Sequence, residues 1–224
     1  MSATKQVVIS GDLNAQTYSA TVWDLVTGTT LKTFRNGGVL ASKCLSLVSD
    51  QFLMAVQKDT AIIHYWALNG KQQQKKIICP AKVNVLTVTP DGHFAIVGIK
   101  EQLFIYQLST GNLLTKLERH FQPITCIKVA GDSSYFISGG EDGYVFVWFT
   151  HEILSNTSFS HGSSNDSSLA GKEPKHSWSY HSAQITDIYC AYSRINGKCA
   201  TCSIDQTCKV NNESALSHFH FFQK

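Results

Sequence analysis

Two groups of residues in this sequence have the side-chain types that chemistry requires. His120, Ser138 and Asp142 offer the imidazole, hydroxyl and carboxylate of a nucleophilic triad, in which the imidazole takes the hydroxyl proton. Cys199 and Cys202 form a CxxC pair, a spacing typical of thiolate ligands to zinc. What either group can do depends on the elements that position it, because triads and metal sites are defined by geometry.

The sequence around the first group predicts three short antiparallel strands. Apolar runs at 124–129, 135–139 and 144–148 are separated by turn residues. In the third run, alternation places three aromatic side chains on one face and two valines on the other. A sheet that is apolar on both faces must be covered on both, either by other sheets or by neighbours of its own kind.

Copies of this strand pattern recur along the chain at a fixed period. Four apolar runs each close on an aromatic residue, at steps of 43, 40 and 42 residues: Trp23, Trp66, Tyr106 and Trp148. A period in the low forties, with strands and turns inside each repeat, is typical of a β-propeller built from four-stranded blades. The predicted fold class is therefore all-β.

The residues around Trp148 resemble the WD-repeat family. In that family a His, a strand hydroxyl, a turn Asp and a Trp form a hydrogen-bonded chain that stabilises each blade. The resemblance gives these structural roles to His120, Ser138, Asp142 and Trp148, with Arg119 in place of the Gly that precedes the family's His. Bonds to a charged turn carboxylate would contribute about 1.5–3 kcal/mol each.

A second set of the same residue types argues against catalysis. His181, Thr201 and Asp205 occupy the equivalent positions one repeat later, with Asn211 where the Trp is expected. Structural networks recur in every repeat, whereas catalytic sites are not expected to. The stretch after Ser138 is a turn between strands with no helix behind it, so it is not a phosphate-binding loop. We expect no catalytic residue and no cofactor.

The cysteines favour buried packing over metal binding. Cys199 and Cys202 lie in a predicted strand, 198–203, and residues three apart on a strand point to opposite faces. Both thiolates therefore cannot easily reach one zinc ion, and the chain has no second CxxC pair. The seven cysteines are expected to be small apolar side chains in a reducing compartment.

The repeats predict one incomplete WD-repeat β-propeller over residues 1–210, with about four and a half blades of an expected seven. The Ser-, Asn- and Gly-rich stretch 156–175 is expected to be a disordered insertion. Strand alternation is expected to stop at Val210, which leaves 211–224 as a divergent tail of a truncated chain or an alternative terminal exon. The first blade lacks its first strand, which such propellers often supply from the C-terminus.

Composition gives no support to a nucleic-acid or membrane surface. The net charge is only +3, and the basic residues are scattered. The basic stretch with Lys71, Lys75 and Lys76 is predicted to be a solvated hairpin tip, and it is the first place to look for direct RNA contact. No apolar run has the length of a signal peptide or a membrane span, so we expect a soluble intracellular protein.

Several longer strings resemble one subfamily of WD-repeat proteins, the Ipi-type propellers. They are residues 72–92, 108–148, 176–192 and 202–210. The resemblance implies a non-catalytic subunit of the nuclear Rix-type complex, which acts in late maturation of the large ribosomal subunit and in processing of the rRNA internal spacers. It implies location in the nucleus, nucleolus and nucleoplasm, with the cytoplasm as a further site.

The same resemblance implies a set of protein partners. They are a proline-, glutamate- and leucine-rich scaffold protein, a helical-repeat subunit, the AAA ATPase midasin and the pre-ribosomal large subunit. The alternative is a general WD-repeat adaptor, such as the substrate receptor of a ubiquitin ligase. An enzyme or a metalloprotein is the third and weakest hypothesis.

Overall fold

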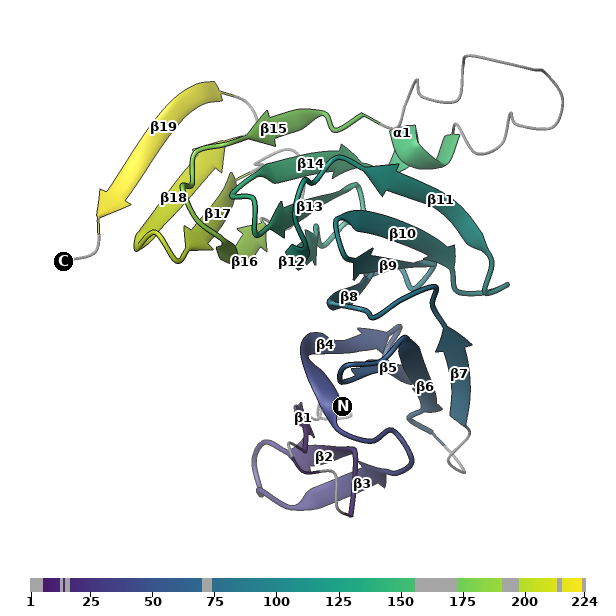
Figure 1. Cartoon of the computed structure of the whole chain (residues 1–224). Helices are drawn as coiled ribbons and strands as arrows, with labels where there is room; N and C mark the ends of the chain where they lie inside the picture. Colours follow the sequence, from purple (N-terminus) through teal and green to yellow (C-terminus); the bar gives the residue numbers. More distant parts are fainter. Residues whose placement is uncertain are drawn as a thin grey trace, which may run out of the picture. The chain divides into compact units, whose positions relative to one another are not determined.

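The strands of the chain assemble into antiparallel sheets, each made of strands that follow one another in the sequence (Figure 1). The computed structural model describes residues 6–12, 14, 17–69, 74–155, 173–190, 198–212 and 215–222. These residues belong to two compact units, residues 1–83 and 84–224. Among the described residues, no helix is long and apolar enough to cross a membrane.

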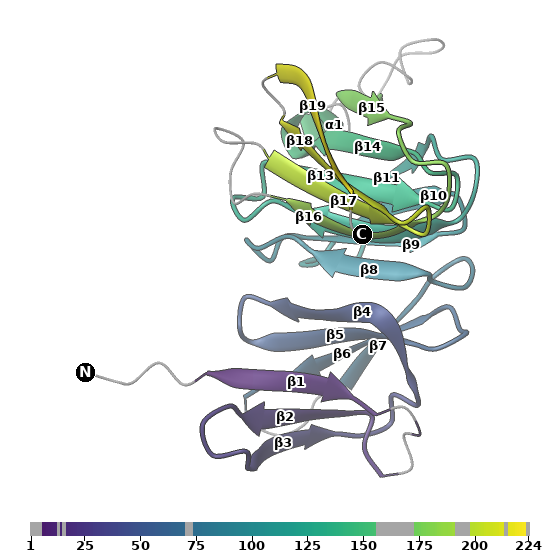
Figure 2. The same cartoon turned by 90° about the vertical axis from the view of Figure 1, so that its left-hand side faces the viewer.

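The first unit contains two sheets. The first sheet has the order β1 (Val7–Gly11), β2 (Ala20–Asp24), β3 (Thr30–Phe34). Figure 2 shows these three strands lying side by side. The second sheet has the order β4 (Leu40–Val48), β5 (Phe52–Gln57), β6 (Ile62–Ala67), β7 (Gln74–Ile78). Within the described residues, the first sheet therefore has one strand fewer than the second, as the sequence predicts.

The second unit contains three four-stranded sheets and a short helix. The third sheet consists of β8 (Val85–Val88), β9 (Phe94–Ile99), β10 (Gln102–Gln107) and β11 (Leu113–Glu118). The fourth consists of β12 (Ile124–Val129), β13 (Tyr135–Gly140), β14 (Val145–Phe149) and β15 (His176–Trp178), with helix α1 (Thr150–Ser155) after β14. The fifth consists of β16 (Ile185–Cys190), β17 (Lys198–Ser203), β18 (Thr207–Asn212) and β19 (Ala215–Phe222).

The fourth sheet is covered on both faces, as its apolar alternation predicts. Phe146 and Trp148 of β14 pack in a cluster with residues of the third sheet, such as Ile96. Val145 and Val147 face the other way and pack with the fifth sheet. Every residue of β13 and β14 is buried. The neighbours that cover this sheet are therefore sheets of the same kind, and the described fold is that of β-propeller blades.

The structure corrects the prediction for the C-terminal stretch. The sequence predicts no strand beyond Val210, but β18 continues to Asn212 and β19 pairs antiparallel with it as the fourth strand of the fifth sheet. The missed signal is the alternation of Phe219 and Phe221 with two histidines, which has the period of a strand.

The predicted disordered insertion, 156–175, lies outside the described residues up to residue 172. Its last three residues are described and make contacts. Glu173 forms an ion pair with Arg119, and the Lys175 N–H donates to the Val147 carbonyl at 2.7 Å. The stretch held to the fourth sheet therefore begins earlier than the sequence predicts.

Candidate functional site

A continuous hydrogen-bonded chain links two loops and two strands of the fourth sheet. His120 precedes β12, Ser138 lies in β13, Asp142 is in the turn between β13 and β14, and Trp148 lies in β14. The His120 Nδ1 atom is 3.1 Å from Asp142 Oδ2, and Nε2 is 2.9 Å from Ser138 Oγ. The Trp148 indole N–H donates to the same Ser138 Oγ at 3.0 Å. The structure thus brings together all four residues of the first predicted set.

One arrangement of protons satisfies the whole chain. The Trp148 N–H donates to Ser138, the Ser138 hydroxyl donates to His120 Nε2, and His120 Nδ1–H donates to the Asp142 carboxylate. That carboxylate also accepts the backbone N–H groups of Phe121 at 2.9 Å and Tyr144 at 3.0 Å. Asp142 therefore fixes its own turn and the loop before β12.

The electrostatics of the network favour the ionised form of Asp142. Burial raises the pKa of its carboxyl, but the hydrogen bonds from His120, Phe121 and Tyr144 outweigh burial and lower the pKa overall. The neutral carboxylic acid accepts such bonds less well, so protonation would weaken the network.

The three triad residues have hydrogen-bond distances that fit a triad, but they lack access. Ser138 is 0% exposed, and its Oγ accepts the Trp148 indole N–H. A substrate therefore cannot approach this hydroxyl, which would be the nucleophile of a triad. The backbone of Gly140 packs closely on the same side chains: a Cβ at this position would lie 2.8 Å from His120 Nδ1 and 2.7 Å from Asp142 Oδ1. No space for a substrate is left beside them. The arrangement is suited to holding a turn, not to turnover.

The fifth sheet repeats this geometry. His181 Nδ1 is 2.9 Å from Asp205 Oδ2, and Nε2 is 2.9 Å from Thr201 Oγ1. Asp205 also accepts the N–H of Ser182 at 3.1 Å and the N–H of Thr207 at 2.9 Å. Burial raises the pKa of the Asp205 carboxyl, but the bonds from Thr207, His181 and Ser182 lower it well below its usual range.

The two networks are connected through a glycine. Gly143, in the turn after Asp142, has a φ of +74°. A Cβ at this position would lie 2.4 Å from the backbone oxygen of His181. Only glycine fits this approach, so the turn of the fourth sheet packs directly on the loop that carries the second histidine.

The second sheet carries a variant of the network that the sequence analysis missed. Trp66 is opposite Leu53 in the sheet, as Trp148 is opposite Phe136, so the residue in the place of Ser138 is Ala55. The Trp66 indole N–H is buried and has no hydrogen-bond partner among the described residues. In the first sheet, by contrast, Trp23 donates to Ser10 Oγ at 2.9 Å.

A buried histidine accompanies Trp66. His64 is 0% exposed, stacks on the Trp66 ring with centroids 5.3 Å apart, and has its Nε2 atom 3.1 Å from Gln57 Oε1. Burial, assisted by the charge of Lys76, lowers the pKa of His64 to about 4. This burial could have been predicted by aligning the strands on their tryptophans. The alignment places His64 at the position of Phe146, which is buried in the fourth sheet.

The predicted basic tip is not supported as one patch. Lys75 and Lys76 lie inside β7, and successive residues of a strand point to opposite faces. Both are exposed, but they do not present their charges to the same side. Lys71 lies outside the described residues. The predicted tip therefore overlaps a strand, because pairing in β7 begins at Gln74.

The CxxC cysteines occupy different environments. Cys199 is 2% exposed and packs in the core cluster between the fourth and fifth sheets. Cys202 instead contacts Cys208 of the neighbouring strand, with a sulfur–sulfur distance of 3.3 Å. Across the part of the chain that the structure describes, no three His, Cys, Asp or Glu side chains gather as a metal site would require.

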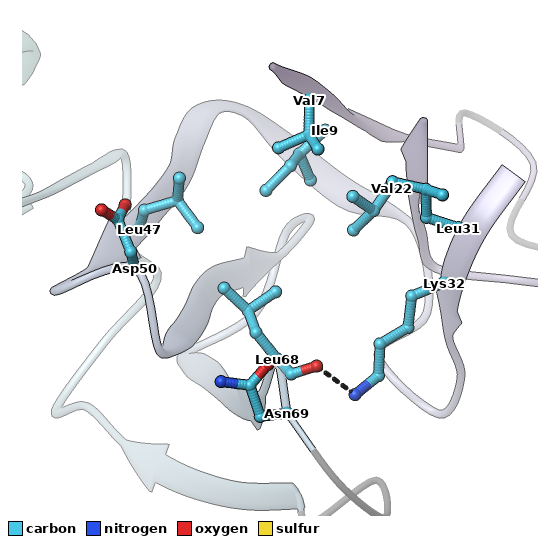
Figure 3. Close-up of a pocket in the computed structure, with 9 residues that line it drawn as sticks. All are labelled: Val7, Ile9, Val22, Leu31, Lys32, Leu47, Asp50, Leu68 and Asn69. Atoms are coloured by element: carbon cyan, nitrogen blue, oxygen red, sulfur yellow. Dashed lines mark hydrogen bonds between the residues drawn. The ribbon is translucent and has the colours of Figure 1, made fainter. Parts of the chain in front are cut away.

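An apolar recess of about 530 Å³ lies between the first and second sheets (Figure 3). Its lining is aliphatic with a polar rim: Val7, Ile9, Val22, Leu31, Leu47 and Leu68, with Lys32, Asp50 and Asn69. The Lys32 ammonium donates to the carbonyl oxygens of Ala67 at 3.1 Å and Leu68 at 2.5 Å, so it ties the two sheets together.

One position that lines the recess carries a smaller side chain than its counterpart in the second unit. Val22 is opposite Ile9 in the first sheet, as Ile105 is opposite Ile96 in the third. In the second unit, Ile153 of α1 is 3% exposed and packs in the same cluster as Ile96 and Ile105. The first two sheets have no described helix in this place, so the space stays open.

Comparison with known proteins places these features in a family context. Residues 111–148 match the family model "WD domain, G-beta repeat". WD repeat-containing protein 18 of Bos taurus is 38% identical over 211 residues, which cover 94% of this chain and 46% of that protein. The chain thus spans about half the length of the curated relatives it matches.

Two more distant relatives have names that mention a process. Protein ROOT INITIATION DEFECTIVE 3 of Arabidopsis thaliana is 27% identical over 193 residues, covering 84% of this chain and 42% of that protein. Pre-rRNA-processing protein pro-1 of Caenorhabditis briggsae is 27% identical over 177 residues, covering 76% of this chain and 31% of that protein.

Proposed function

We propose that this WD-repeat protein, similar over most of its length to WD repeat-containing protein 18, is a non-catalytic scaffold in ribosome biogenesis. It would act as a subunit of a nuclear Rix-type complex in late large-subunit maturation and in processing of the rRNA internal spacers. The similarity to pre-rRNA-processing protein pro-1 supports this process, because the name of that relative states pre-rRNA processing.

A scaffold role is supported mainly by the hydrogen bonds of the buried polar side chains. The histidine, hydroxyl and aspartate side chains that could do chemistry are buried and engaged in fixing turns, in two successive sheets. Rigid turns hold loop side chains in place, and Phe121, whose N–H is bonded to Asp142, is 77% exposed. An ordered, exposed aromatic side chain is typical of the anchors that dominate protein interfaces.

The proposed partners follow from the family resemblance. They are the proline-, glutamate- and leucine-rich scaffold protein, the helical-repeat subunit, midasin and the pre-ribosomal large subunit, met in the nucleolus and nucleoplasm. No membrane contact is proposed, and direct RNA contact is not part of the proposal because the two described lysines of the basic stretch do not share a face.

The experiment is an affinity purification of the tagged 1–224 chain from nuclear extract, with the co-purifying proteins identified by mass spectrometry. We expect the leucine-rich scaffold and the helical-repeat subunit to co-purify. Phe121→Ala should reduce their recovery without changing the melting temperature, because the side chain is exposed. Recovery of cullin-type ligase components in their place would overturn the proposal in favour of a ubiquitin-ligase adaptor.

A further inference from the structure

Two cysteines face each other across the fifth sheet. Cys202 of β17 is directly opposite Cys208 of β18 in the strand register. The Cys202 thiol donates to the Cys208 sulfur, and the two sulfur atoms are 3.3 Å apart. Both side chains are partly exposed, so small reagents can reach them from solvent.

This pair differs from the other cysteines of the chain. Cys44, Cys79, Cys126 and Cys199 are buried. Cys190 is opposite Cys199 in the neighbouring strand pair, so a second cross-strand pair exists for comparison. Its Cys199 member is 2% exposed and packed in a core cluster, which protects it from reagents. Proximity and accessibility therefore coincide at Cys202 and Cys208.

We propose that Cys202 and Cys208 form a reversible disulfide across β17 and β18, which makes the fifth sheet sensitive to oxidation. Directly opposed residues of an antiparallel pair have Cα atoms about 4.5–5.5 Å apart, inside the span that a disulfide bridges. The sulfur atoms must approach by about 1.3 Å to reach the bonded distance of about 2.05 Å. Rotation of the two side chains within the hairpin can supply this.

A small-molecule disulfide such as oxidised glutathione is the oxidant. The Cys208 thiolate attacks one of its sulfurs, which breaks that bond, releases one glutathione thiolate and leaves a mixed disulfide on Cys208. The released glutathione thiolate takes up the proton that Cys208 lost. Cys202 then loses its proton, its thiolate attacks the Cys208 sulfur and breaks the mixed disulfide, and the second glutathione thiolate leaves and takes up that proton. Two protein thiols are oxidised and one glutathione disulfide is reduced to two thiols.

The order of attack follows from the environment of Cys202. Burial, followed by its bond to Cys208 and the charges of Cys208 and Asp187, raises the pKa of the Cys202 thiol to about 11. The raised pKa lowers the thiolate fraction of Cys202, which favours it as the second sulfur to react. The hairpin between the two cysteines carries Asp205, which binds His181, so the disulfide would tie the base of the turn that holds this network.

The test is a glutathione redox titration of the full 1–224 chain. Free thiols are alkylated with a first label in denaturant, and disulfides are then reduced and alkylated with a second label. Trypsin releases Cys199, Cys202 and Cys208 in one peptide, residues 199–209. In the oxidised protein we expect the first label on Cys199 and the second label on Cys202 and Cys208. After treatment with reduced glutathione, Cys202 and Cys208 should carry the first label, as Cys199 does.

Variants identify the pair. Cys208→Ser should abolish the loss of two thiols, and Cys202→Ser should trap glutathione on Cys208. Cys199→Ser should leave the Cys202–Cys208 bond unchanged. First labels on both Cys202 and Cys208 under oxidising conditions, or a bond between Cys190 and Cys199 in their place, would overturn the proposal.

Discussion

At the scale of single residues, the sheets differ in whether the indole N–H of their tryptophan has a hydrogen-bond partner. Trp148 donates to Ser138, and Trp23 donates to Ser10. Trp66 has Ala55 at the same position and leaves its N–H without a described partner. An unsatisfied buried donor costs about 1–3 kcal/mol, so these small differences set where the fold is stable.

Asp142→Ala should lower the free energy of unfolding by about 1–3 kcal/mol, because it leaves His120 and the Phe121 N–H without their acceptor. Urea denaturation measures the change. Glu141→Ala, at an exposed position in the same turn, is the matched control and should be neutral. An unchanged midpoint for Asp142→Ala would contradict the structural role given to this network.

Ala55→Ser should raise the free energy of unfolding by about 1 kcal/mol, because its hydroxyl would lie where Ser138 accepts the indole of Trp148. The gain should vanish in a Trp66→Phe background, which removes the donor. A double-mutant cycle of thermal denaturation isolates this coupling. Equal effects in both backgrounds would show that the serine acts through something other than Trp66.

Stability should fall as the pH drops from about 6.5 to about 4, by up to about 3 kcal/mol, because His64 must take up a proton that its buried site disfavours. The folded-state pKa is lowered, so the contribution is fully present above the unfolded pKa and is lost on acidification. His64→Phe introduces the residue found at the matching position of the fourth sheet. It should remove the dependence of stability on pH between about 6.5 and about 4. The networks of Asp142 and Asp205, whose pKa values are also lowered, should weaken only below about pH 4.

At the scale of strands and sheets, sequence periodicity predicts most of the architecture. The predicted strands 124–129 and 198–203 match β12 and β17 to the residue. These runs combine alternation with clear turn residues at both ends. The packing of β14 between two neighbouring sheets also follows from its sequence, since both of its faces are apolar.

The misses have physical causes of the same kind. The presence of β19 was not predicted, because polar histidine side chains obscure the apolar alternation of its sequence. The recess between the first two sheets depends on side-chain volumes across an interface, which no single-strand pattern encodes. The pairing of Cys202 with Cys208 depends on strand register, and the CxxC spacing pointed instead to Cys199.

Val22→Ile should raise the free energy of unfolding by about 0.5–1 kcal/mol, because the added methylene fills part of the recess, as Ile105 does in the third sheet. Chemical denaturation of the whole chain provides the measurement. Val26→Ile adds the same atoms at a position that is 86% exposed and should change nothing. Destabilisation by Val22→Ile would mean that the recess has no room at this point.

At the scale of the whole molecule, burial is uneven between the sheets. Every residue of β13 and β14 is buried, whereas in β1 only Ile9 is half-buried and the other four residues are exposed. The fourth sheet is covered on both faces, and its network fixes both of its adjoining turns. The most completely buried strands described therefore lie in the sheet that carries the histidine network beside the exposed Phe121.

Native-state amide exchange should rank the strands accordingly. We expect β13 and β14 to exchange slowest and β1 to exchange fastest, because local opening requires least disruption where few side chains are buried. Hydrogen–deuterium exchange with peptide-level mass spectrometry resolves this order. Equal protection of β1 and β13 in the isolated chain would contradict the described packing.

The central claim, a scaffold in large-subunit maturation, is tested most directly by gradient sedimentation of nuclear extract that contains the tagged 1–224 chain. Each fraction is probed for the tag and for precursor RNA that retains the internal spacer. The account predicts that the chain sediments with pre-60S particles and that Asp142→Ala moves it toward the top of the gradient. Sedimentation of the folded wild-type chain apart from every spacer-containing particle would contradict the account.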